Sequence, residues 1–275
     1  MPSLTELFET CPSDDKYEGL VFNSNLFDRL FGEFGAEYGT KIFLSAPPAS
    51  GKTSLALQWA THAMLQKYPV LWMAGEMRLK DLRTRLFQQL LGWSKEKVRR
   101  RDDDLSTRDS VDRSELVKKI GYLGKLWQFV EAPFTTDDIA NWIKVHNAKF
   151  IVIDYLQTIR SEDSGSLNSI DRLDSIVSEL NELCQKKGVV MLIISNMAKG
   201  DMRNRNLFNS FKGSSLIEFS ADLAFVGQIE ESPKNPKVPR VTFKCLKNRH
   251  NDAIDIDTYF DKTTQRFRPF RDIAQ

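Results

Sequence analysis

Short runs of apolar residues alternate with amphipathic segments along most of this 275-residue chain. The apolar runs lie at 42–44, 70–74, 126–130, 150–153 and 189–195. Runs of this length, bounded by Gly, Pro or polar residues, predict buried strands. Because helical patterns separate them, we expect an α/β fold with a mostly parallel central sheet flanked by helices.

The segments between the runs predict helices with one apolar face. They include a helix from Lys52 to about Gln66, one near 112–124, one that begins at Thr135 or Thr136, and one that carries Leu173, Ile176, Val177, Leu180 and Leu183. Near the carboxyl terminus the pattern changes, because the strands predicted at 221–228, 240–246 and 253–260 have only turns between them. The turn at 247–252 is short, so an antiparallel hairpin is expected there.

Three polar stretches are expected to lie outside the core. Residues 1–20 are predicted to form a solvated tail, with an arm that docks on a neighbouring subunit as the alternative, and residues 21–275 to form one domain. Residues 94–115 place a basic run directly before Asp102–Asp104, which predicts a solvated helical excursion whose charges mostly cancel. Residues 161–169 are predicted to form a flexible loop.

Composition and charge narrow the class of protein. The chain has 41% hydrophobic and 28% charged residues and a formal net charge of +2, so any nucleic-acid site must be local. The three cysteines have no close spacing, which is typical of a reducing compartment. No apolar run is long enough to span a membrane, and the amino terminus does not resemble a signal peptide. A cytoplasmic protein without a membrane partner is expected.

The main chemical feature is a Gly-Lys-Thr loop between the first core strand and the following helix. The candidate phosphate-binding residues are Ala46, Pro47, Pro48, Ala49, Ser50, Gly51, Lys52, Thr53 and Ser54. Inward-facing amides and the positive end of a helix favour an anion here. Lys52 would contact the β- and γ-phosphates, and Thr53 would ligate Mg²⁺. Ala46 replaces the usual first Gly of the motif, so a chance Gly-Lys-Thr is the alternative.

Polar residues follow three other predicted strands. Glu76 comes just after the strand at 70–74 and is a candidate to orient and polarise the attacking water. Asp154 ends the strand at 150–153 and is the expected outer ligand of Mg²⁺. Asn196 ends the strand at 189–195. Because the carboxyl ends of parallel strands line the ligand crevice, these residues are expected to meet there.

The longest irregular segment, at 198–214, is a candidate nucleic-acid contact. It has one acid, two Phe residues (Phe208 and Phe211), and the cations Lys199, Arg203, Arg205 and Lys212. A basic loop with aromatic residues is suited to gripping a phosphodiester backbone. A solvated loop without such a role is the alternative.

Several of these pieces together resemble the C-terminal motor domain of DnaB-type replicative helicases, within the RecA-like ATPases. The resemblance covers about residues 21–268. It is carried by LFDRLFGEFGAEYG at 26–39, APPASGKT, AGEM at 74–77, IDYLQTI at 153–159, SNMA at 195–198, GSSLIEFSADLAFV at 213–226 and KNRHND at 247–252. Members of this family often have Ala at the position of Ala46.

The resemblance implies roles for individual residues. Lys52 and Thr53 would bind phosphate and Mg²⁺, Glu76 matches the catalytic glutamate, and Asp154 matches the Mg²⁺-organising aspartate. Arg85 falls where the family has an arginine after its glutamate. Lys247 and Arg249 match a basic pair that reaches the nucleotide of the neighbouring subunit. The cofactors implied are ATP and Mg²⁺, and the assembly implied is a cyclic homo-oligomer, usually a hexamer.

Two departures from the family pattern are visible. Asn196 stands where the family usually has Gln, so the γ-phosphate sensor would carry its amide on a shorter stem. The usual N-terminal domain does not fit into the first 20 residues. A minimal motor of the kind that a phage or mobile element encodes, a specialised relative or an excised fragment would each explain this.

The sequence leaves three functions open. The first is an ATP-driven motor on single-stranded DNA, with a loader or primase as a further partner. The second is an ATPase that binds DNA without unwinding it, such as a recombination mediator or helicase-loading factor. The third is a nucleotide-switched scaffold without a DNA role.

Overall fold

The computed structural model describes residues 19–22, 26, 28–31, 35–161, 168–197, 211, 216–231 and 235–270. Within these residues, the centre of the fold is a nine-stranded sheet with the order β13-β12-β11-β10-β3-β9-β7-β4-β5. Its strands are β3 (Lys41–Ala46), β4 (Val70–Ala74), β5 (Trp127–Glu131), β7 (Phe150–Asp154), β9 (Val190–Asn196), β10 (Leu223–Glu230), β11 (Arg240–Asn248), β12 (Ile256–Asp261) and β13 (Arg266–Pro269). Strands β10, β3, β9, β7, β4 and β5 are parallel, and β10 to β13 pair in antiparallel fashion. The predicted fold class is therefore confirmed.

The apolar runs form strands because both of their faces are buried. In β7, Phe150 and Val152 pack into one hydrophobic cluster, whereas Ile151 and Ile153 pack into a second cluster on the opposite face. Strand β9 alternates in the same way. Burial on both faces is typical of parallel strands that are covered by helices.

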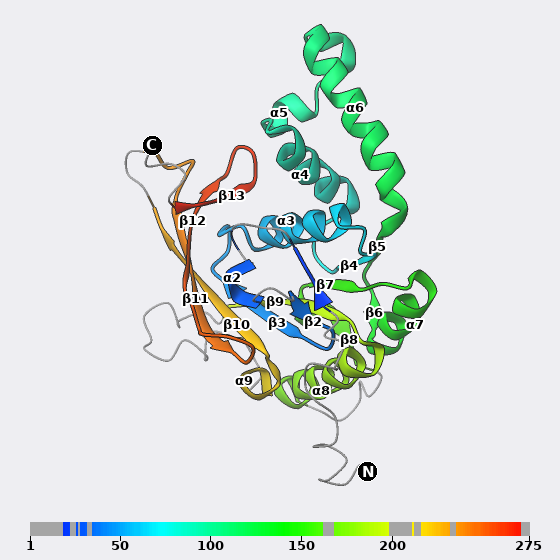
Figure 1. The fold of residues 1–275 in the computed structure, drawn as a ribbon, viewed down its shortest axis with the longest axis vertical. Coiled ribbons are helices and arrows are strands. Elements are labelled where there is room, and N and C mark those ends of the chain that lie inside the picture. Colours follow the sequence, from blue (N-terminus) through cyan, green and yellow to red (C-terminus); the bar gives the residue numbers. More distant parts are fainter. Residues whose placement is uncertain are drawn as a thin grey trace, which may run out of the picture.

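Helices cover the two faces of the sheet (Figure 1). Helix α3 (Lys52–Leu65) packs in the first cluster, and helices α7 (Thr136–His146), α8 (Ser169–Lys187) and α9 (Leu216–Ser220) pack against the second. Helix α7 begins at a capping box, in which the side chains of Thr135 and Asp138 each bond to the other residue's backbone N–H. Helix α8 ends at Gly188, which has the left-handed conformation.

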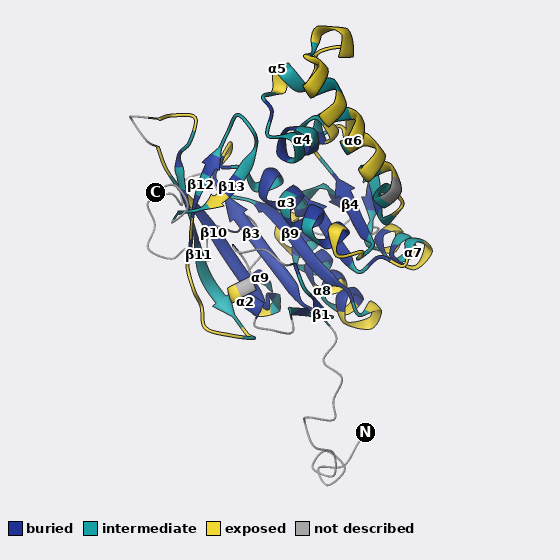
Figure 2. Ribbon diagram, turned by 45° about the horizontal axis from the view of Figure 1, so that its top comes forward, coloured by how far each residue is buried: buried dark blue, intermediate teal, exposed yellow. Residues whose placement is uncertain are grey.

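A helical excursion leaves the sheet between β4 and β5. It consists of α4 (Leu79–Leu91), α5 (Lys95–Val98), η2 (Asp102–Asp104), α6 (Thr107–Leu123) and η3 (Gly124–Leu126). Figure 2 shows that most of α6 is exposed to solvent. The predicted solvated excursion is confirmed, but α6 begins at Thr107 rather than near 112 because Ser106 caps it.

Short elements complete the described part of the chain. Strands β1 (Gly19–Leu20) and β2 (Ala36–Glu37) form one antiparallel pair, and β6 (Phe134–Thr135) and β8 (Ile159–Arg160) form a parallel pair. Helix α2 is Asp28–Phe31, and the 3-10 helix η4 is Leu156–Thr158.

Three expectations for the carboxyl-terminal region were wrong in detail. Helix α9 and the edge strand β13 were not predicted, because each is too short to have a clear periodicity. Strand β12 begins at Ile256 rather than Ala253, and Lys247 belongs to β11 rather than to the turn.

None of the helices in the described ranges is both long and apolar enough to cross a membrane.

Candidate functional site

The loop between β3 and α3 has the backbone shape of a phosphate cradle. Gly51 has a φ of 92° and Ala49 a φ of 62°, both in the left-handed region. A Cβ at Gly51 would lie 2.8 Å from Cζ of Phe267, so both conformation and space require glycine. The hydroxyl of Ser50 donates to the Pro47 carbonyl at 2.7 Å and closes the loop on itself. Helix α3 starts at once, without an acidic residue in its first turn. These features fit a bound phosphate.

Lys52 lies inside this loop. Its ammonium donates to the backbone carbonyls of Ala46 at 2.6 Å and Pro47 at 3.2 Å. Burial lowers the pKa of Lys52, while the carboxylates of Asp154 and Glu76 act in the opposite direction. The cation is therefore held at the cradle and faces two acidic groups from other strands.

The sheet order brings the predicted strand-end residues to one edge. Ala46 is in register with Asn196, and Asp154 is in register with Ala74 on one side and Ile194 on the other. Glu76 follows Ala74 by two residues. We call this edge, with Lys52, Thr53, Glu76, Asp154 and Asn196, the carboxyl edge. The expected meeting of these residues at one edge of the sheet is what the register describes.

Asp154 is the most perturbed of these groups. Burial raises its pKa to about 6, and the nearby Glu76 adds to the rise. A hydrogen bond from the Thr53 hydroxyl, together with the charges of Lys52 and Arg85, acts in the opposite direction. A buried carboxylate beside a hydroxyl supplies the hard oxygen ligands that Mg²⁺ prefers. The residues present therefore fit the expected metal.

Arg85 extends the candidate site toward helix α4. The side chain is half-buried, and burial lowers its pKa, whereas Asp154, Asp81 and Glu76 act in the opposite direction. A guanidinium near these carboxylates can approach the same phosphates as Lys52.

Lys247 and Arg249 lie elsewhere. In β11, Asn248 pairs with Leu223, which is in register with Ile42 near the amino end of β3. Lys247 Nζ donates to the carbonyl of Glu218 at 2.7 Å, and Arg249 Nη2 donates to that of Phe219 at 2.6 Å. We call Lys247 and Arg249 the basic hairpin. The structure thus does not bring it together with the carboxyl edge of its own chain.

Two further polar groups escaped the sequence analysis. Asp222 accepts a bond from Arg249 Nη1 at 3.1 Å and from Lys41 Nζ at 2.8 Å, and the Lys41 side chain is only 2% exposed. A charged residue that opens a buried strand was the available signal for Lys41. Gln157, the last residue of IDYLQ, contacts the end of β9, as detailed below.

The predicted nucleic-acid residues Lys199, Arg203, Arg205 and Lys212 lie outside the described residues. Phe211 is described, and here the expectation was wrong. It is 3% exposed, its ring packs edge-on against Phe43 with centroids 6.4 Å apart, and it forms a β-bridge with Met197. A core ring cannot stack on a base, so aromatic contacts from Phe211 are excluded.

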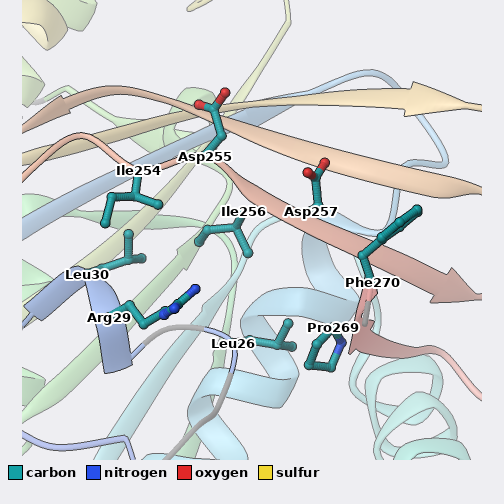
Figure 3. A pocket seen from close by; sticks show the side chains of 9 residues that line it. All are labelled: Leu26, Arg29, Leu30, Ile254, Asp255, Ile256, Asp257, Pro269 and Phe270. Carbon is teal, nitrogen blue, oxygen red and sulfur yellow. The ribbon is translucent and has the colours of Figure 1, made fainter. Parts of the chain in front are cut away.

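A recess of about 260 Å³ lies apart from the carboxyl edge, between α2 and β12 (Figure 3). Leu30 and Ile256 line it, and Arg29 is beside them. The carboxylates of Asp255 and Asp257 point away from these apolar side chains and pair with cations of β11. The acids are thus engaged within the sheet, and the recess adds no group to the candidate site.

A buried strand, a loop with left-handed residues, a helix that starts at Lys52 and a carboxylate on a nearby strand define a RecA-like P-loop ATPase core. Residues 23–269 match the DnaB-like helicase C terminal domain family. The chain belongs to this family.

Similar proteins agree with this assignment. A protein from Trieres chinensis named "Probable replicative DNA helicase" is 25% identical over 257 residues, which cover 85% of this chain. This chain spans about half, 54%, of that relative's length. One solved structure, of an isolated ATPase domain, has a TM-score of 0.81 at 19% identity and covers 97% of both chains. "The Structure Of A DnaB-Like Replicative Helicase And Its Interactions With Primase" has a TM-score of 0.81 at 18% identity, and covers 96% of this chain and 67% of that one.

Proposed function

We propose that this protein is an ATP-hydrolysing motor that forms a ring and moves along single-stranded DNA. The observation that carries the proposal is the separation of the carboxyl edge from the basic hairpin within one chain. A chain that holds the two halves of an ATPase site at opposite edges of its sheet needs a second copy to complete the site.

The separation follows from the length of β3. Lys52 follows the carboxyl end of this strand, whereas Arg249 is bonded to Asp222 beside Lys41 at its amino end. At about 3.3 Å per residue, a six-residue strand spans roughly 16 Å. An arginine side chain does not bridge that span, so Arg249 would act on the nucleotide of a neighbouring subunit, and repeated contacts of this kind close a ring.

Within one subunit, each residue at the carboxyl edge has a defined task. Lys52 and the loop amides would bind the phosphates, and Glu76 would orient the attacking water and accept its proton. Thr53 and Asp154 would hold Mg²⁺, which neutralises charge on the phosphates when bound. Lys247 and Arg249 of the neighbour would stabilise the charge that develops on the γ-phosphate.

The DNA part of the proposal is supported by the family, by the helicase name of the Trieres relative and by the predicted cations Lys199, Arg203, Arg205 and Lys212. These cations would contact phosphates rather than bases, so binding is expected to tolerate any sequence and to weaken with salt. A primase is a further candidate partner, because one structure with the same fold is named for that interaction.

The test is ATP turnover with and without single-stranded DNA, followed by strand separation on a forked duplex. We expect DNA to stimulate turnover, and Glu76→Gln to lower kcat about 10²- to 10⁴-fold because it removes the general base. Glu131→Gln, at the end of the adjacent β5, is the control and should leave kcat within about 2-fold, because general-base catalysis belongs to the group that reaches the water.

Other outcomes would identify the alternatives. Strong stimulation by DNA without strand separation would favour the recombination-mediator or loading role. Turnover that ignores DNA would favour the nucleotide-switched scaffold.

A further inference from the structure

Gln157 closes a small ring of hydrogen bonds around the backbone of Asn196. Its Nε2 donates to Ser195 Oγ at 3.0 Å, and its Oε1 accepts the Asn196 backbone N–H at 3.3 Å. The Ser195 hydroxyl in turn donates to the Asn196 carbonyl at 3.4 Å. Both backbone polar groups of Asn196 are therefore bound by this ring, which needs a side chain that is donor and acceptor at once.

The other side of η4, the 3-10 helix that carries Gln157, lies against the segment that leads from β4 to Glu76. A Cβ on Gly75 would lie 2.1 Å from Thr158 Oγ1, so the hydroxyl of Thr158 occupies the space of a missing side chain. The Thr158 hydroxyl also donates to the Tyr155 carbonyl at 2.6 Å, and the Gly75 N–H donates to the Asp154 carbonyl at 2.7 Å. The 3-10 helix thus contacts the residue before Glu76 at one end.

The result is a continuous contact between two groups of the proposed site. Glu76 follows Gly75 after β4, Thr158 packs on Gly75, and Gln157 binds the backbone of Asn196 at the end of β9. Because the Asn side chain is short, the reach of its amide depends on where the backbone is held. A misplacement of about 1 Å at a reacting centre can lower a rate about 10²-fold.

We propose that Gln157 is a positioning residue for hydrolysis, holding Asn196 at a fixed place relative to Glu76 through η4. This inference rests on the proposed ATPase function. Gln157 does not touch the nucleotide in this role, so its loss should lower kcat and leave nucleotide binding largely intact.

The experiment compares Gln157→Leu with Gln58→Leu in steady-state ATP turnover. Gln58 is a matched control, because its Oε1 also accepts a backbone N–H, from Phe267 at 3.0 Å, and its Nε2 donates to the carbonyl of that residue at 3.1 Å. We expect Gln157→Leu to lower kcat at least 10-fold, up to about 10²-fold, with KM within about 2-fold. Gln58→Leu should change kcat by no more than about 2-fold, since its bonds link α3 to β13 instead of holding the reacting centre.

Ser195→Ala is a second variant that keeps the test decisive if Gln157→Leu does not fold. It removes one member of the ring with a small loss of volume, and kcat should fall by less than in Gln157→Leu. In the double variant the two losses should not add, because both break the same ring.

The outcomes separate this inference from the proposed function. If the unmodified protein hydrolyses ATP and Gln157→Leu behaves like Gln58→Leu, or raises KM as much as it lowers kcat, the positioning role is overturned alone. The positioning role is overturned in the same way if Ser195→Ala leaves kcat unchanged. If the unmodified protein does not hydrolyse ATP, the proposed function fails and this inference falls with it.

Discussion

The carboxyl edge and the basic hairpin are held in place by different means. At the carboxyl edge, four adjacent parallel strands bring Lys52, Asp154 and Asn196 together, and burial raises the pKa of Asp154 to about 6. In the basic hairpin, the Arg249 side chain is 51% exposed and binds a carbonyl and a carboxylate of its own chain. Charges at the carboxyl edge face one another, whereas those of the hairpin are already partnered.

The difference concerns how easily each half can move. An exposed ion pair contributes only about 0–1 kcal/mol, so the bond from Arg249 to Asp222 can be exchanged for a stronger anion such as a neighbour's phosphate. The bond from Asp222 to Lys41 is buried and is expected to stay. The hairpin therefore combines a fixed anchor with a detachable cation, while the carboxyl edge is preorganised by the sheet.

Replacing Arg249 should have the largest effect on activity. Arg249→Ala is expected to lower kcat about 10³- to 10⁵-fold, the range found for an arginine supplied to a phosphoryl transfer. The exposed cation Arg268, on β13, provides the control, and Arg268→Ala should leave kcat within about 2-fold if the effect belongs to the finger alone. Turnover of ATP with and without single-stranded DNA is the measurement.

Mixing variants tests whether this arginine acts on a neighbour. In a ring that combines Arg249→Ala with Lys52→Ala subunits in equal amounts, about a quarter of the interfaces have both an intact loop and an intact finger. Activity should therefore return to about a quarter of the unmodified level at that ratio. Absence of any recovery at all mixing ratios would contradict a site shared between subunits.

Removing the anchor should cost stability more than any exposed pair does. Asp222→Ala leaves the Lys41 ammonium buried and unpaired, so the free energy of unfolding should fall by about 3–5 kcal/mol. Asp255→Ala removes an exposed ion pair with Lys244 on the same set of strands and should change it by only about 0–1 kcal/mol. Urea unfolding followed by circular dichroism measures both. Equal losses would mean that the anchor is no more important than a surface pair.

Arg85 sharpens the description of the carboxyl edge with a smaller effect. Arg85→Ala should lower kcat about 10²- to 10³-fold, the range for loss of one preorganised electrostatic contact. Arg83 lies two residues earlier on the same helix but is exposed, and Arg83→Ala should leave kcat unchanged. If the two variants have the same kcat, Arg85 does not belong to the site.

Much of the fold was predictable because its signals are local. The bounds predicted for β4 agree with the structure, and those of β3, β7, β9 and α3 are within two residues, since each is a continuous apolar run or a clear helical repeat. Strand β13 and helix α9 were missed, because four or five residues are too few to define a period. The ring of Phe211 was expected at a DNA contact and is in the core, because a loop aromatic carries no local sign of what it packs against.

The sequence by itself determined which residues follow each strand and which loop could cradle a phosphate, since these depend on neighbours along the chain. The sheet order decided what lies beside what. Because β3 pairs with β9 on one side and β10 on the other, Asn196 lies next to the loop and Arg249 lies at the opposite end of β3. The contacts of Gln157 with Ser195 and of Asp222 with Lys41 join residues 38 and 181 positions apart. Pairings over such distances leave no periodicity in the chain, so only the tertiary structure could supply them.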